Sequence, residues 1–127
     1  MTIKYYYHTK QRYILTKVSG ITTLNETLEH FNNLIEDPLL NDQFVEIVDF
    51  SETINFDFGY YQTGQLADKV KQLSDLKNYL GSILIADKDF IRGMAHMFKV
   101  VAEDRLLNFK IANDCEEAET LVNEYFS

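Results

Sequence analysis

Leu80 to Ala86 form a nearly continuous apolar run, which restricts the possible folds more than any other segment. The residues before it, up to about residue 76, and those after it, from about residue 90, have the apolar spacing of amphipathic helices. A short apolar run between two helices is typical of a parallel strand that is buried on both faces. The chain is therefore predicted to fold as an α/β domain with a mostly parallel sheet.

The first part of the chain predicts an antiparallel hairpin followed by a helix. Residues 3–7 and 12–18 are rich in β-branched and aromatic side chains, and Gly20 is expected to end the second strand. Thr23, with Glu26 three residues later, has the pattern of a capping box at the start of a helix.

That first helix is expected to end at Asp37-Pro38, because the residue before a proline is pushed out of the helical region. Its spacing places His30 between core positions, so this histidine is predicted to be partly exposed. The predicted inner face consists of Leu24, Leu28, Phe31 and Ile35.

The remaining segments alternate between strand and helix patterns. The expected elements are a strand at 44–50, a loop that leads to Gly59, a helix to about residue 76, the strand at 80–86, a helix capped by Asp87 or Asp89, a short strand at 108–112 and a helix capped by Asp114. The order is ββαβαβαβα, which predicts a mixed, mostly parallel five-stranded sheet with helices in a single domain over residues 1–127.

The charge distribution argues against a nucleic-acid partner. The formal net charge is −8, and residues 21–58 hold nine acidic side chains without a lysine or arginine. Such a surface repels phosphates, which nucleic-acid-binding proteins neutralise with clustered cations. The basic, tyrosine-rich residues 1–20 are interpreted as a hairpin whose lysines protect an edge strand.

No stretch has the ~18 consecutive apolar residues of a transmembrane helix, and the first residues lack a secretory signal pattern. With one cysteine, Cys115, there is no disulfide framework, so a cytoplasmic location is predicted. No motif pairs a nucleophile with a base, holds a metal or binds a cofactor. The chain is therefore predicted not to be an enzyme and to carry neither metal nor cofactor.

Three segments carry a resemblance to a known family: Val18 to Thr22, Val45 to Ser51, and Ile83 to Ala86 followed by Arg92 to Phe98. Together with the order of elements, they resemble the STAS domain, in its SpoIIAA-like branch, which is related in name to the CRAL-TRIO lipid-binding group. The resemblance implies a non-enzymatic regulatory domain that acts by contacting a protein partner.

The sequence departs from this family at the regulatory motif. Anti-sigma-factor antagonists carry an Asp-Ser-x-Gly motif at the start of the second helix, and its serine is phosphorylated. The matching segment here, residues 54–59, keeps Asp57 and Gly59 but has Phe58 and no serine between them. Serine-switched exchange of partners is therefore not expected in its standard form.

Two functions remain open. The first is a protein-interaction domain, expected to form a homodimer, whose contact surface consists of Asp57, Phe58, Gly59, Tyr60 and Tyr61. The second is a carrier or sensor of an apolar or lipid-like ligand, with a pocket formed by Phe56, Met94, Met97 and Phe98. The competing interpretation of these aromatic and methionine side chains is ordinary core packing.

Overall fold

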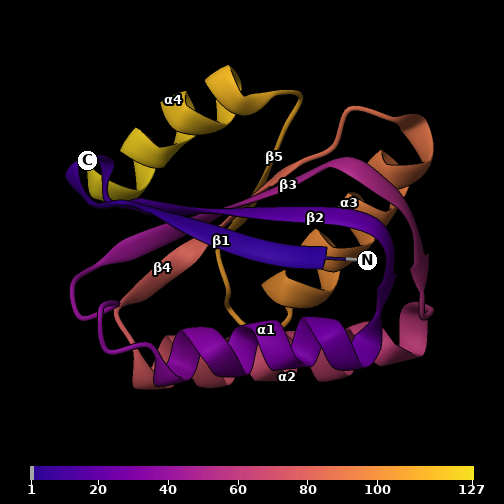
Figure 1. The fold of residues 1–127 in the computed structure, drawn as a ribbon, viewed down its shortest axis with the longest axis horizontal. Coiled ribbons are helices and arrows are strands. Elements are labelled where there is room, and N and C mark those ends of the chain that lie inside the picture. The colour runs from indigo at the N-terminus through magenta and orange to yellow at the C-terminus, as the bar shows by residue number, and fades with distance from the viewer. Residues whose placement is uncertain (1) are drawn as a thin grey trace.

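The computed structural model describes residues 2–127 and contains one five-stranded sheet with the strand order β1-β2-β3-β4-β5 (Figure 1). Strand β1 is antiparallel to β2, and the other neighbouring strands are parallel. The strands are β1 (Thr2–His8), β2 (Tyr13–Thr23), β3 (Phe44–Asp57), β4 (Tyr79–Ile85) and β5 (Phe109–Ala112). The helices are α1 (Leu24–Glu36), α2 (Tyr60–Leu76), α3 (Asp89–Glu103) and α4 (Cys115–Phe126), with a 3-10 turn at Thr9–Gln11. The predicted fold class and order of elements are confirmed.

Helices cover both faces of the sheet, as the apolar strands require. Val45 and Ile47 of β3 pack in the same cluster as Ala118 and Val122 of α4. The alternate residues of β3 point to the other face, because successive side chains of a strand alternate. Figure 1 shows α1 and α2 side by side on that face, opposite α4.

Local capping signals correctly predicted several helix boundaries. Thr23 caps α1, and its hydroxyl oxygen accepts a hydrogen bond from the backbone amide of Glu26 at 3.2 Å. Asp37 follows the last residue of α1, and Asp114 caps α4 by accepting from the amide of Glu117 at 2.8 Å. These signals involve neighbours in the sequence, so they can be interpreted without knowledge of tertiary packing.

Three predicted boundaries were wrong. Gly20 does not end β2; it adopts a φ of 77° beside a register irregularity, and the strand continues to Thr23. Strand β3 likewise continues to Asp57, so most of the predicted loop pairs with the end of β2. At α3 the N-cap residue is Lys88, without a side-chain cap.

The predicted inner face of α1 was also partly wrong. The buried residues of the helix are His30, Phe31 and Leu34, and only Phe31 was expected in the core. His30 is 6% exposed, which corrects the prediction of a partly exposed histidine. The shift has a physical reason, because His30 faces a buried carboxylate on the sheet, described below. None of the helices within residues 2–127 is long and apolar enough to cross a membrane.

Candidate functional site

A cavity lies between the sheet and helices α1, α2 and α3. Its volume is about 70 Å³, and its lining is mostly apolar. The aromatic part of the lining comes from Phe31, Phe50, Phe56, Phe58, Phe98 and Phe109. Val18, Val48, Leu66, Val70 and Leu84 add aliphatic surface. Ligand pockets are commonly concave and apolar with a few placed polar groups, and this cavity has that composition.

The strands supply the polar part of the lining from alternate positions. Thr16 of β2, Glu46 of β3 and Ser82 of β4 lie on three adjacent strands, and Glu46 pairs with Ser82 in the parallel register. All three are at most 1% exposed. The buried face of the sheet therefore carries a polar row between apolar residues, and His30 reaches this row from α1.

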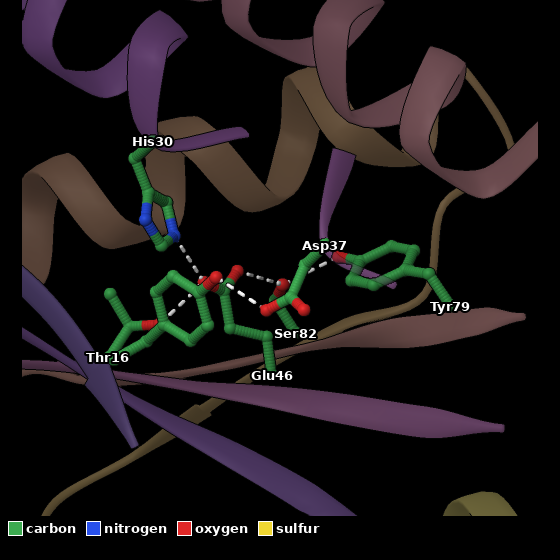
Figure 2. A network of polar contacts seen from close by, with 7 residues as sticks. Thr16, His30, Asp37, Glu46, Tyr79 and Ser82 are labelled. Carbon is green, nitrogen blue, oxygen red and sulfur yellow. Dashed lines mark hydrogen bonds and ion pairs between the residues drawn. The ribbon is translucent and has the colours of Figure 1, made fainter. Parts of the chain in front are cut away.

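Glu46 is the centre of this network, and Figure 2 shows His30 directed toward it from α1. His30 Nε2 lies 2.7 Å from Glu46 Oε2, and the Thr16 hydroxyl donates to the same oxygen at 2.7 Å. The Ser82 hydroxyl donates to Glu46 Oε1 at 3.3 Å, and the Tyr79 hydroxyl lies 2.5 Å from Ser82 Oγ. The carboxyl group of Glu46 thus has three polar partners and is fully buried. A buried polar group is tolerated when it is hydrogen-bonded in this way.

Thr22 is the exception among the buried polar side chains. It lines the cavity and is 2% exposed. Among the described residues, its Oγ1 is the buried side-chain oxygen or nitrogen that has no hydrogen-bond partner. A buried polar group without a partner costs about 1–3 kcal/mol, so its presence in a cavity needs a specific explanation.

The residue types of the network also occur in hydrolases, but their arrangement differs. A catalytic serine donates to a histidine, which a carboxylate orients. Here the carboxylate of Glu46 lies between Ser82 and His30, and Ser82 donates to Glu46. This arrangement is not the serine–histidine pairing of that triad. It fixes the side chains around the cavity instead.

A second polar cluster joins the N-terminal hairpin to the end of α1. The Tyr5 hydroxyl donates to Asp37 Oδ2 at 2.6 Å, and Tyr7 donates to the same oxygen. Burial opposes the ionised form of Asp37, but the hydrogen bonds from Tyr5, Tyr7 and the Leu39 amide, with the charge of Lys77, hold the pKa of this carboxyl below its usual value. Burial and the neighbouring carboxylate raise the pKa of Tyr5. The cluster is therefore an anchor for the edge strand.

The structure brings together some of the predicted pocket residues. The Phe56 and Phe98 rings are edge to face at 5.4 Å, and both line the cavity. Phe58 packs on both rings and lines the cavity as well. Met94 and Met97 are half-buried in α3, but neither belongs to the described lining of this cavity.

The predicted contact residues lie at the junction of β3 and α2. Asp57 is the exposed last residue of β3, and Gly59 is the N-cap of α2. Tyr60 and Tyr61 occupy the first turn of α2 and are 62% and 90% exposed. Phe58 points inward instead, toward the aromatic side of the cavity.

Sequence analysis did not single out the polar row or Thr22. One signal was present, because Glu46 is the charged residue in the apolar segment Phe44 to Val48. A charge at the centre of a strand that is buried on both faces requires a buried partner. That partner, His30, is separated from it by 16 positions and is found only when α1 is placed on the sheet.

Comparisons with known proteins are consistent with this architecture. One similar solved structure is an uncharacterised protein of the DUF3478 family with a SpoIIAA-like fold from Shewanella loihica PV-4. It has a TM-score of 0.61 and 16% identity over 95% of this chain and 92% of the other. A second is the anti-sigma factor antagonist SpoIIAA in its unphosphorylated form, with a TM-score of 0.58 and 10% identity over 99% of both chains.

These similarities confirm the predicted SpoIIAA-like fold. No family model matches the sequence, and no curated protein matches it either. At identities of 10–16%, the comparisons establish the arrangement of the backbone. Function has to be argued from the side chains of this chain.

Proposed function

We propose that this chain is a non-enzymatic, cytoplasmic regulatory domain that binds a small, largely apolar ligand in the cavity beneath α1, α2 and α3. The observation that carries the proposal is the unpaired Thr22 hydroxyl in a mostly apolar lining whose network of Thr16, His30, Glu46 and Ser82 is already hydrogen-bonded. A packed core normally leaves neither such a void nor such a hydroxyl. A ligand would supply the missing contacts and the missing hydrogen bond.

The position of the cavity supports a regulatory role. Phe58, Thr63 and Leu66 line it, and all three belong to α2 or to the turn that precedes it. The exposed Tyr60 and Tyr61 follow Phe58 closely and form the first turn of α2. A ligand that changes the packing of Phe58 therefore acts on the segment that carries these tyrosines.

Nuclear magnetic resonance titration with cyclopentane tests ligand binding, because this hydrocarbon requires only apolar space. We expect saturable shifts of amide signals from residues around the cavity. Ala67→Leu is the matched variant, since Ala67 is 6% exposed and lines the cavity. The larger side chain is expected to fill the space and abolish binding in a folded protein. Equal binding by this variant would place cyclopentane elsewhere and contradict the proposal.

A second candidate function is contact with a protein partner, which can be another copy of this chain. The contact surface consists of Asp57, Gly59, Tyr60 and Tyr61. The exposure of the two tyrosines favours it, because exposed aromatic side chains commonly anchor interfaces. In this case the aromatic pair at the start of α2 takes the place of the family's serine-bearing motif.

Sedimentation analysis of Tyr61→Ser tests the homodimeric form of this candidate. Leu39→Ser is the control, because Leu39 is also an exposed apolar residue, at 68%. It precedes the amino end of β3, whereas Tyr61 follows the carboxyl end of β3, so the two residues lie at opposite ends of that strand. The tyrosine variant is expected to lower self-association and the leucine variant to leave it unchanged. A monomeric wild-type protein, or equal effects of the two substitutions, would contradict self-association through this surface.

A further inference from the structure

We infer that the ligand of this cavity is a compact, uncharged molecule with a single hydrogen-bonding group, such as a small alcohol or ketone. The inference rests on the proposed function, because it assumes that the cavity is a ligand site. It narrows the ligand class, and it excludes the long-chain acids that a lipid carrier would bind.

The size of the cavity excludes a long chain. A cavity of about 150 Å³ in another protein holds one benzene molecule. The cavity volume here is about 70 Å³, or roughly half of that value. The aromatic rings around it are in mutual contact, at centroid distances of 5.4 Å for Phe56 with Phe98 and 5.6 Å for Phe56 with Phe58. By this scale about three carbon atoms fit without rearrangement, and a compact ring of about five carbon atoms requires the lining to open slightly.

The polar group of the ligand is assigned to Thr22. Its hydroxyl can donate one hydrogen bond and accept others, so it can pair with an alcohol or a ketone. The other polar side chains of the network already have partners: Thr16 and Ser82 donate to Glu46, and His30 pairs with it. Thr22 lies opposite Phe56 in the pairing of β2 with β3. Thr22 therefore lies beside Phe56, on the aromatic side of the cavity.

The charges of the lining exclude an anionic ligand. None of the described lining residues is a lysine or an arginine. His30 is the one basic side chain of the lining, and it is paired with Glu46. A carboxylate in this cavity would be buried without a positive partner, which is far more costly than burial of a neutral group.

A cationic ligand is excluded for a related reason. Glu46 is the acidic residue of the described lining, but its two oxygens are shared among three polar side chains. An ammonium group has three donors. The Thr22 hydroxyl oxygen has two lone pairs and cannot satisfy all three, so at least one donor would remain without an acceptor from it. An uncharged ligand with one polar group matches what the lining offers.

A series of five-membered rings tests this inference by the same amide titration. Cyclopentane, cyclopentanol, cyclopentanecarboxylate and cyclopentylammonium share one apolar body and differ in the polar group. We expect cyclopentane and cyclopentanol to bind and the two ions not to bind. Binding of the carboxylate or the ammonium ion with an affinity equal to that of the alcohol would overturn the inference about charge.

Substitution of Thr22 tests the assigned hydrogen bond. Thr22→Val keeps the shape but removes the hydroxyl, so it is expected to weaken cyclopentanol binding about tenfold and leave cyclopentane binding unchanged. Thr22→Ser keeps the hydroxyl and is expected to retain the binding of cyclopentanol. If Thr22→Val weakens neither compound, the assignment of the polar group is wrong, although the cavity remains a ligand site. If neither cyclopentane nor cyclopentanol binds the wild-type protein, the proposed function itself is wrong.

Discussion

Two buried threonines should respond in opposite ways to the same substitution. Thr22 and Thr16 are 2% and 1% exposed, both belong to β2, and both line the cavity. The Thr16 hydroxyl donates to the buried Glu46 carboxylate at 2.7 Å, whereas the Thr22 hydroxyl has no partner among residues 2–127. Replacement by valine keeps the branched shape of each side chain and removes only its hydroxyl, so the comparison isolates the hydrogen bond.

The magnitudes follow from the two environments. Removal of the unpaired Thr22 hydroxyl recovers its desolvation penalty, which is expected to raise the free energy of unfolding by about 1 kcal/mol. Removal of the Thr16 hydroxyl takes a donor from a buried carboxylate, which is expected to lower the free energy of unfolding by about 2 kcal/mol. With a urea m-value of about 2 kcal/mol/M, the midpoints would shift by about +0.5 M and −1 M.

Equilibrium urea unfolding measures both midpoint shifts. Far-ultraviolet circular dichroism is the signal, because the chain has no tryptophan to report unfolding by fluorescence. The m-values of the three proteins should agree, so that the midpoints report stability alone. If Thr22→Val destabilised the protein as much as Thr16→Val, the Thr22 hydroxyl would have a partner in the unliganded protein. Thr22 would then not be an unpaired group that a ligand completes.

Three further predictions concern other parts of the fold. His30→Ala is expected to lower the free energy of unfolding by about 3–5 kcal/mol in a denaturant titration, because it leaves Glu46 buried without its ring partner; a loss below 1 kcal/mol would contradict this role. Asp37 has a lowered pKa, so its contribution to stability is present above the unfolded-state pKa of about 3.9 and is lost as the pH falls through the folded-state value. Asp37→Asn should therefore flatten the acid limb of a stability–pH profile, and an unchanged limb would refute this. Gly81 has a φ of 155°, and a Cβ there would lie 2.1 Å from a backbone oxygen, so Gly81→Ala should cost more than about 3 kcal/mol in thermal unfolding. Gly93→Ala, in an open helical position, should instead stabilise the protein by about 0.5–1 kcal/mol, and similar effects at both glycines would contradict the local geometry.

Sequence patterns predicted the elements of this fold because most of their signals are local. The apolar run from Leu80 to Ala86 became a central parallel strand, and the caps at Thr23 and Asp114 were correctly placed. The extensions of β2 and β3 were missed. They depend on pairing between the two strands, such as Thr22 with Phe56 and Thr23 with Asp57. Such pairing overrides the tendency of a glycine to end a strand.

The candidate site was predicted less well, because it consists of contacts between distant elements. The aromatic residues Phe56 and Phe98 were expected together and do line one cavity. Met94 packs against the same hydrophobic cluster without lining the cavity, and Met97 is half-buried outside the described lining. The polar row could not be assembled without the strand register that aligns Glu46 with Ser82. The missing partner of Thr22 is a property of the packed structure and leaves no trace in the sequence.

The most direct test of the central claim is the detection of intermolecular nuclear Overhauser effects between cyclopentane and the side chains of the labelled protein. We expect contacts with the methyl groups of Thr22, Val48 and Leu84 and with the ring protons of Phe98, all of which line the cavity. Contacts confined to exposed side chains such as Tyr61, or no contacts at saturating cyclopentane, would contradict the claim that this cavity is a ligand site.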